Sequence, residues 1–204
     1  MSILTIAHAQ ESGTQGGVLS QSDSRKGAAF AMTNATADNR IISYSRAADG
    51  ALSRVGSIST RGNGNGVDLE TQGGLRLSSD HRYLYAVNAG SDEITVFSVD
   101  GTDLTFLQKV YAGDQPNSLT IYEDLLYVLD GSVAGNGILG FKVASDGTLT
   151  EMPDSFRLLS SPITVPGQVK FSPDGRRLLL PRRRPTFCCR RLTPSTRTGS
   201  ATTA

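Results

Sequence analysis

A short turn pattern that returns along the chain is the sequence feature that most constrains the fold. Asp-Gly stands between segments rich in β-branched and aromatic residues, which is the strongest short-range signal of a β-hairpin. The three copies are Asp49-Gly50, Asp100-Gly101 and Asp146-Gly147. Since helical periodicity is not evident anywhere along the chain, the pattern predicts an all-β protein.

A second turn pattern recurs in phase with the first. Ser78–Leu84 returns as Phe171–Leu178, and Tyr122–Tyr127 is a shortened version. The combined period of roughly 45–50 residues is typical of β-propeller blades. One sheet cannot bury both of its faces, whereas sheets stacked radially cover each other. A β-sandwich is the alternative, because Asp-Gly turns are common in any all-β protein, but two patterns in phase favour the propeller.

The best-defined unit begins at Leu75. It predicts strands over 75–77, 83–87, 93–99 and 104–110, joined by tight polar turns. Within Glu93–Val99, Ile94 and Val96 face one way while Thr95, Phe97 and Val99 face the other. Both faces carry apolar residues, so we expect this strand to be covered on two sides.

Further units lie on both sides of this one. We expect a first blade from Gly27 to about Arg61, a third from about Gln115 to Leu159, and the start of a fourth from Pro166 to Leu180. Gly62–Gly66 is predicted to be a flexible crossing loop. It resembles a phosphate-binding loop only in composition, because no helix-forming run and no Lys-Ser/Thr follow it.

The two ends differ from the repeats, so the predicted boundaries are 1–26, 27–180 and 181–204. Residues 1–26 are expected to be a disordered terminus or the stub of a signal peptide, since Ala7-His8-Ala9 resembles a cleavage site but no basic segment precedes it. Residues 181–204 are basic and without periodicity. They are interpreted as an interrupted or frame-shifted end, and the alternatives are a basic arm for nucleic acid or an acidic membrane surface, or a solvated disordered tail.

Charge and cysteine content bound the function further. Six of the 20 basic residues and none of the 19 acidic residues lie in 181–204, so the remainder carries 14 basic and 19 acidic side chains. This mildly acidic body offers no footprint for nucleic acid, and no segment is long and apolar enough to cross a membrane. The adjacent Cys188 and Cys189 make no metal site. We expect no cofactor, and the compartment, cytoplasmic or secreted, stays open.

Three segments, Ser45–Leu52, Tyr83–Phe97 and Val169–Arg176, carry a resemblance to a known family. They resemble the lactonase-family seven-bladed β-propellers, which include propeller-type 6-phosphogluconolactonase and fungal 3-carboxymuconate cyclase. The resemblance implies a partial propeller of about three four-stranded blades and the start of a fourth. It also implies that the protein hydrolyses or forms a lactone of a sugar acid or of a muconate-type acid. A non-catalytic binding scaffold is the alternative, because propellers host both.

Four amide side chains are the candidate substrate-binding residues, because they lie where the chain enters predicted innermost strands. They are Gln72, Gln115, Asn117 and Gln168. Amides can orient a lactone or a carboxylate but are poor proton shuttles at neutral pH. The alternative for them is hydrogen bonding at turns and strand edges. Catalytic residues stay unassigned.

The resemblance implies His, Arg and Glu near the axis, but Gln115-Pro116-Asn117 lacks the histidine that many of the resembling enzymes have there. His81 is expected to be exposed in a turn, and Asp68, Glu70, Asp92, Glu93 and Asp130 to be solvated loop acids. An open fan of blades also leaves one sheet face uncovered at each end. We therefore expect either a loosely folded chain or a partner chain that covers these faces.

Overall fold

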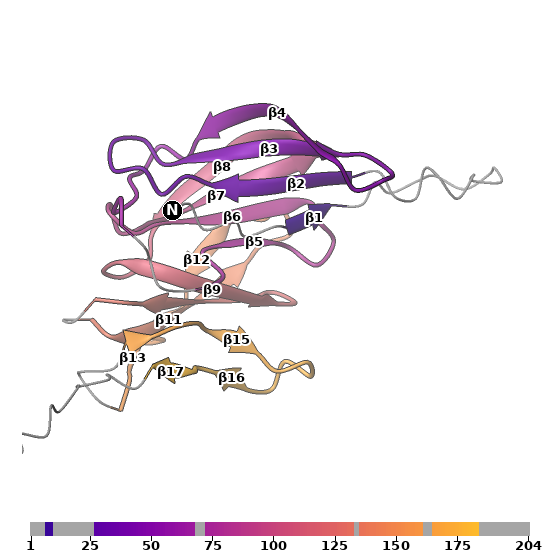
Figure 1. Ribbon diagram of the computed structural model, residues 1–204. Helices are drawn as coiled ribbons and strands as arrows, with labels where there is room; N and C mark the ends of the chain where they lie inside the picture. Colours follow the sequence, from indigo (N-terminus) through magenta and orange to yellow (C-terminus); the bar gives the residue numbers. More distant parts are fainter. Residues whose placement is uncertain (1–6, 10–26, 68–71, 133–134, 161–164, 184–204) are drawn as a thin grey trace, which may run out of the picture.

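The computed structural model describes residues 7–9, 27–67, 72–132, 135–160 and 165–183, which form antiparallel β-sheets (Figure 1). The first sheet has the strand order β1-β2-β3-β4, with β1 (Ala7–Ala9), β2 (Gly27–Met32), β3 (Arg40–Arg46) and β4 (Leu52–Ser59). The second has the order β5-β6-β7-β8, with β5 (Leu75–Leu77), β6 (Tyr83–Asn88), β7 (Glu93–Asp100) and β8 (Asp103–Tyr111). Within these ranges, no helix has the length and hydropathy to span a bilayer.

The third sheet has an interrupted outer strand. It consists of β9 (Pro116–Tyr122), β10 (Leu125–Asp130), β11 (Gly137–Val143), β12 (Leu149–Glu151) and β13 (Arg157–Leu158). Both β12 and β13 pair with β11, on either side of a turn that contains Pro153. Proline has no backbone N–H to give to the ladder, so a break is expected there.

A hairpin follows the third sheet. It pairs β14 (Val165–Pro166) with β17 (Arg182–Arg183), and β15 (Lys170–Phe171) with β16 (Leu178–Leu179). The Phe171 ring packs against Tyr122 and Tyr127 of the third sheet, with centroids 5.6 and 5.7 Å apart. The hairpin therefore continues the stack, as expected for the beginning of a fourth blade.

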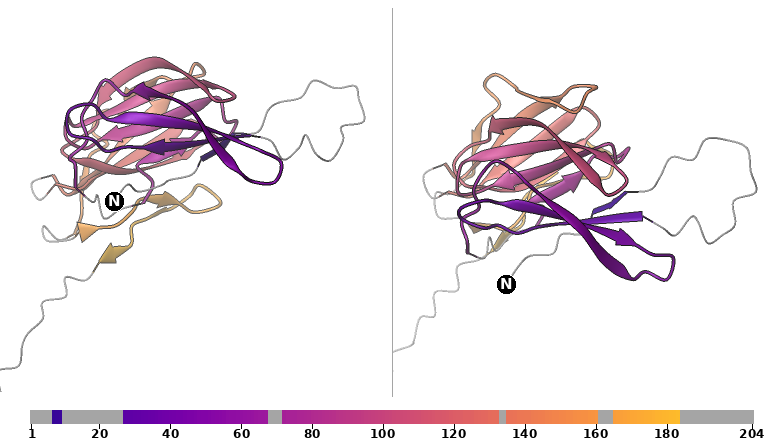
Figure 2. Two further views of the ribbon diagram at one scale, coloured as in Figure 1. Left: turned by 45° about the horizontal axis from the view of Figure 1, so that its top comes forward. Right: turned by 90° about the horizontal axis from the view of Figure 1, so that it is seen from above.

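The sheets are stacked face to face in chain order, as the three views of Figures 1 and 2 show. The first strands of successive sheets contact one another, β1 with β5, β5 with β9, and β9 with β15. We call the edge formed by these four strands the axial edge. The predicted partial propeller is confirmed, and the sandwich alternative, with two facing sheets, is wrong.

Two hydrophobic cores fill the spaces between the sheets. Phe30, Ile41, Leu84 and Phe97 belong to the core between the first and second sheets. The core between the second and third sheets includes Ile94, Val96, Tyr85, Leu126 and Phe141. Strand β7 thus supplies both cores from opposite faces, as predicted, and a bulge between Val96 and Phe97 interrupts its pairing with β8.

The Asp-Gly turn of the third sheet also fastens that sheet to the second. The Tyr83 hydroxyl donates to Ser145 O at 2.9 Å, and the Tyr85 hydroxyl donates to Gly147 O at 3.0 Å. Gly147 has φ +83° and packs so closely on the Tyr83 ring that a Cβ atom there would collide with it. The turn that marks the repeat in sequence is therefore also a contact between sheets.

The prediction of a flexible loop at Gly62–Gly66 is wrong. Gly64 N–H donates to Ala35 O at 2.7 Å, and Gly90 N–H donates to Asn63 O at 2.9 Å. The Asn34 side chain donates to Asn65 Oδ1 at 2.8 Å. The glycines let this connection pack against the β2–β3 and β6–β7 loops, since a Cβ atom at Gly64 would collide with the Asn34 backbone.

The structure also differs from the prediction at the two ends of the chain. Strand β1 lies inside the segment expected to be disordered, because the free edge of β2 offers backbone groups that Ala7–Ala9 can pair with. Strand β17 likewise lies inside the predicted tail and pairs with β14. The other residues of 1–26 and 181–204 lie outside the described residues.

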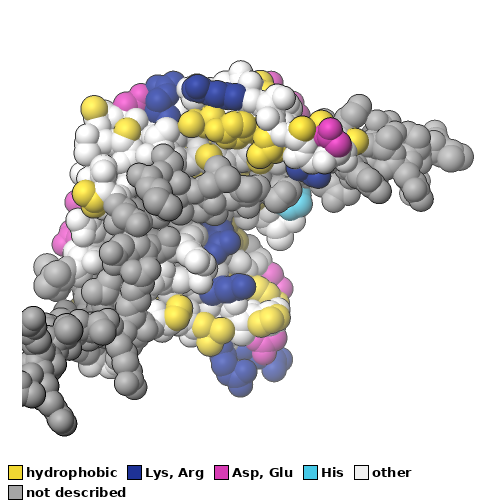
Figure 3. Space-filling model, in the orientation of Figure 1, with side chains coloured by type: hydrophobic (Ala, Val, Ile, Leu, Met, Phe, Trp, Pro, Cys, Tyr) yellow, Lys and Arg dark blue, Asp and Glu magenta, His cyan; other side chains and the backbone are white. Residues whose placement is uncertain are grey.

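The outward face of the first sheet carries apolar side chains. Ala29, Ala31, Ile42 and Tyr44 alternate with the residues of the inner core and so point away from the second sheet. In Figure 3, hydrophobic side chains gather over this sheet at the top of the molecule. Cover of such a face by a partner chain stays a prediction.

Candidate functional site

Three segments from three sheets meet around the Ser118 side chain at the axial edge. The Ser118 hydroxyl donates to Gln72 O at 2.6 Å and accepts the Val169 N–H at 3.1 Å. Leu119 N–H donates to Gly73 O at 2.9 Å, and Gln72 N–H donates to Gly167 O at 3.0 Å. We call this meeting point the axial junction. It exists because residues 72–73 lie just before β5, Ser118 lies near the start of β9, and residues 167–169 directly precede β15.

The chain segments that carry three of the four predicted amides meet at the axial junction. Gln72, Asn117 and Gln168 each lie next to a residue that bonds there. Gln72 is exposed, while Asn117 and Gln168 are half-buried. Gln115 lies instead on the exposed connection between the second and third sheets, where its N–H donates to Asp92 Oδ1 at 2.9 Å. A role for these amides in binding substrate stays a prediction.

Arg76 is a residue of the junction that sequence reasoning missed. It lies on β5, and its half-buried guanidinium reaches across to the third sheet, with Nε 3.4 Å from Leu119 O. Nη2 and Nε lie 2.8 and 3.1 Å from the position that a Cβ atom of Gly73 would occupy, and Ser118 Oγ lies 3.2 Å from the same point. The available signal was a charged residue between two leucines in a first strand.

The charge of Arg76 lacks the compensation found at other basic side chains. Burial lowers the pKa of Arg76 from its ordinary value, because the charged form loses hydration. Among the described residues, carboxylates form ion pairs with Arg40, Arg82, Lys109 and Lys142, but none does so with Arg76. Its neighbours among the described residues are the Leu119 carbonyl, Gly73 and the Ser118 hydroxyl.

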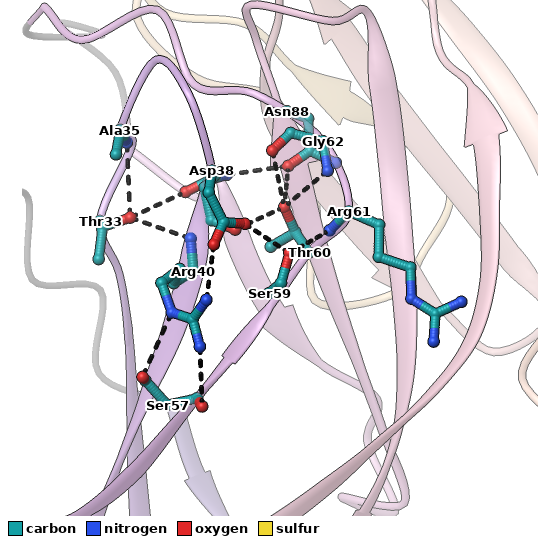
Figure 4. A network of polar contacts seen from close by, with 11 residues as sticks. Thr33, Ala35, Asp38, Arg40, Ser57, Ser59, Thr60, Arg61, Gly62 and Asn88 are labelled. Carbon is teal, nitrogen blue, oxygen red and sulfur yellow. Dashed lines mark hydrogen bonds and ion pairs between the residues drawn. The ribbon is translucent and has the colours of Figure 1, made fainter.

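A second polar cluster is structural. Asn39, Thr60, Asn88 and Thr95 are fully buried between the first and second sheets. Asn39 Nδ2 donates to Asn88 Oδ1 at 2.9 Å, Thr60 Oγ1 lies 2.7 Å from the same oxygen, and Asn88 Nδ2 donates to Thr95 Oγ1 at 2.9 Å. Figure 4 shows Thr60 and Asn88 of this network beside the Asp38–Arg40 ion pair. Because these amide and hydroxyl groups hydrogen-bond to one another, the cluster joins the two sheets and leaves few donors or acceptors for a ligand.

The prediction that Asp130 is a solvated loop acid is wrong. Its side chain is buried at the end of β10, and its two carboxylate oxygens accept the N–H groups of Ser132 and Asp114, each at 3.0 Å. It therefore holds the neighbouring loops. Asp68 and Glu70 lie outside the described residues. Within the described ranges, no group of three or more His, Cys, Asp or Glu side chains is placed to hold a metal ion.

The two histidines lie in different parts of the fold. His81 is half-buried rather than exposed, in the β5–β6 turn on the far side of β5 from the junction, and has a left-handed backbone (φ 60°). His8, expected in a disordered segment, lies on β1, where it pairs with Ala29. The backbone of His8 is therefore part of the axial edge.

Comparisons with known proteins agree with this architecture. The model of a family described as "Lactonase, 7-bladed beta-propeller" matches residues 24–158. A search of curated proteins finds no match. Among solved structures, the periplasmic gluconolactonase of Pseudomonas aeruginosa is 18% identical, with a TM-score of 0.58 over 76% of this chain and 47% of that one.

Two further solved structures have the same fold. A putative 6-phosphogluconolactonase from Bacteroides uniformis is 14% identical, with a TM-score of 0.57 over 78% of this chain and 48% of that one. A Lactobacillus plantarum protein is 19% identical, with a TM-score of 0.52 over 67% of this chain and 40% of that one. This chain thus spans half or less of the length of these structures.

Proposed function

Because this chain belongs to the lactonase family of seven-bladed β-propellers, we propose that it hydrolyses the lactone ring of a sugar acid at the axial junction. The observation that carries the proposal is the meeting of Gln72, Asn117 and Gln168 segments around Ser118. The names of two similar structures, a gluconolactonase and a putative 6-phosphogluconolactonase, support the choice of substrate class.

The reaction needs a polarised carbonyl and an activated water. Water adds to the lactone carbonyl carbon, the ring C–O bond breaks, and the ring oxygen leaves as a hydroxyl that has taken up a proton. Amide N–H groups at the junction donate to the carbonyl oxygen and the sugar hydroxyls, which fixes the ring and stabilises the charge that develops on the carbonyl oxygen. Since amides do not take up protons at neutral pH, a carboxylate or a histidine activates the water.

The test is a pH-stat assay of the purified full chain, because opening a lactone releases a proton. We expect 6-phosphogluconolactone to be hydrolysed faster than it hydrolyses spontaneously, and Asn117→Ala to lower kcat/KM by about tenfold or more, the loss expected for a substrate hydrogen bond. Asn63→Ala is the matched control, since it removes an exposed amide from the Gly62–Gly66 connection.

Three outcomes would change the proposal. Turnover of muconolactone alone would replace the sugar acid by a muconate-type acid. Binding of the hydroxy acid without turnover would favour a binding scaffold. Turnover no faster than the spontaneous reaction for every lactone would overturn the enzymatic function of this chain.

A further inference from the structure

Arg76 carries a half-buried charge that the described structure does not neutralise. Within the part of the chain that the structure describes, its guanidinium makes one hydrogen bond, the long contact of 3.4 Å from Nε to Leu119 O. A guanidinium has five N–H donors in a planar fork, and that contact uses one of them. Placing a cation partly out of water costs free energy unless an anion or several acceptors compensate for it.

The position of the fork relates it to the axial junction. Nη2 and Nε occupy the space that any side chain at residue 73 would need, so Gly73 leaves room for the guanidinium beside the entry to β5. The Ser118 hydroxyl borders the same space, and Ser118 also bonds to the Gln72 and Val169 backbones. The charge therefore lies between the segments that carry Gln72 and Asn117.

A purely structural role does not account for a charge at this place. The bonds from Leu119 N–H to Gly73 O and from the Ser118 hydroxyl to Gln72 O already join the second and third sheets. A neutral side chain of similar length would fill the space without the cost of desolvation. An arginine is the residue that recognises carboxylate and phosphate groups through paired N–H donors.

We propose that the guanidinium of Arg76 binds the anionic group, a carboxylate or a phosphate, of a ligand held at the axial junction. The inference rests on the proposed function for the identity of that ligand as a sugar acid or its lactone. The amides of Gln72, Asn117 and Gln168 then contact the hydroxyls of the same ligand, and Arg76 selects the charged sugar over the neutral one.

Calorimetric titration of the full chain with three related probes tests this. The probes are 6-phosphogluconate, gluconate and neutral sorbitol, which separate phosphate, carboxylate and hydroxyl recognition. We expect Arg76→Gln to weaken binding of at least one anionic probe by about tenfold or more, the loss of a charge-assisted hydrogen bond. Sorbitol binding stays unchanged, and Arg76→Lys, which keeps the charge but not the fork, lies between.

Arg82→Gln is the matched control. It makes the same change in net charge in the β5–β6 turn, at the opposite end of β5 from residues 72–73, where Arg82 is exposed and pairs with Asp80. Because salt screens exposed charges, its effect on affinity should stay below about twofold at 0.15 M salt. A comparable loss in both variants would mean that the total charge, and not the Arg76 fork, attracts the anion, and would overturn the inference.

Other results also overturn it. These are wild-type protein that binds neither anionic probe, Arg76→Gln that binds them as tightly as wild type, and a fall in ligand-free Tm in both Arg76 variants with equal loss of all three probes. Activity separates this inference from the proposed function. Arg76-dependent binding without turnover refutes the function alone, whereas turnover of 6-phosphogluconolactone with KM unchanged by Arg76→Gln refutes the inference alone.

Discussion

Gly50 and Gly147 occupy the same place in two Asp-Gly turns, yet their surroundings differ. Both have a positive φ, +91° and +83°. A Cβ atom at Gly50 would meet nothing within 4 Å, whereas one at Gly147 would collide with the Tyr83 ring of the preceding sheet. At Gly50 only the backbone conformation of the turn requires glycine. At Gly147 both the turn conformation and the packing between sheets require it.

This difference predicts unequal effects of alanine at the two positions. Gly50→Ala should cost about 1 kcal/mol, the strain of a left-handed alanine. Gly147→Ala should cost about 2–4 kcal/mol, because overpacking against Tyr83 adds to that strain. Urea unfolding of the two variants measures both values. Equal losses would show that the Tyr83 contact contributes nothing.

At the scale of strands, the polar network between the first two sheets depends on an amide at the end of β6. Asn88 Oδ1 accepts from Asn39 while its Nδ2 donates to Thr95, so the side chain must do both. The last residue of β10, at the same place in the third sheet, is Asp130, whose oxygens accept backbone N–H groups. At the same position of the repeat, an amide holds neighbouring side chains in one sheet, and a carboxylate holds loop N–H groups in the other.

Removal of the Asn88 amide should therefore destabilise the protein strongly. In Asn88→Ala, the Asn39 amide and the hydroxyls of Thr60 and Thr95 each lose a buried partner, and the expected cost is about 3 kcal/mol or more. Ser57→Ala, which removes an exposed hydroxyl that bonds to Arg40, should stay within about 0.5 kcal/mol. Chemical denaturation provides the comparison, and a loss below 1 kcal/mol for Asn88→Ala would contradict the assigned role.

How far the sequence predicts these elements depends on the range of the interactions that decide them. Asp-Gly turns and alternating strands are local, and the two faces of β7 were predicted from Ile94, Val96 and Phe97. The packed Gly62–Gly66 connection depends on Asn34 and Gly90, which are distant in sequence. Strand β1 depends on a free edge of β2, and the burial of Asp130 depends on N–H groups of two other loops.

The candidate site shows the same division. Placing Gln72, Asn117 and Gln168 at first-strand entries needed only the repeat, and the structure brings these segments together. The repeat alone did not show that Gln115 lies away from the junction. Gln115 is on the exposed connection before β9. The position of Arg76 between two leucines of a first strand was visible in the sequence, but the burial of its guanidinium was not, since it depends on the approach of the third sheet.

For the whole molecule, aspartates in the turns link stability to pH. Burial raises the pKa of Asp80, but hydrogen bonds from the Ser78 hydroxyl and from the side chain and backbone of Arg82 outweigh it and lower the pKa to about 2. Asp174 occupies the same place in the last hairpin, and bonds from the Ser172 hydroxyl and the Arg176 N–H lower its pKa too. A carboxylate with a lowered folded-state pKa stabilises the fold above its unfolded-state pKa.

The protein should therefore lose stability in acid. The contribution of Asp80 is complete above the unfolded-state pKa of 3.8 and is lost as the pH falls through about 2. Since the side chain is partly exposed, we expect less than about 1 kcal/mol from it. Tm measured between pH 2 and 6 at constant ionic strength should fall below pH 4 in wild type and less steeply in Asp80→Asn. Parallel curves would contradict this assignment.

The agreement between the order of the sheets along the chain and their order in space has a consequence for synthesis. The strands of each sheet follow one another along the chain, and only β1 is separated from the rest of its sheet by a longer segment. Each new sheet packs on the sheet that was synthesised just before it. Burial of the nascent chain then advances sheet by sheet, and no early segment waits for a distant late one to cover its inner face. Chains released after 112 residues should already protect the core around Phe97 from proteolysis, while Ile94 and Val96 stay open to attack.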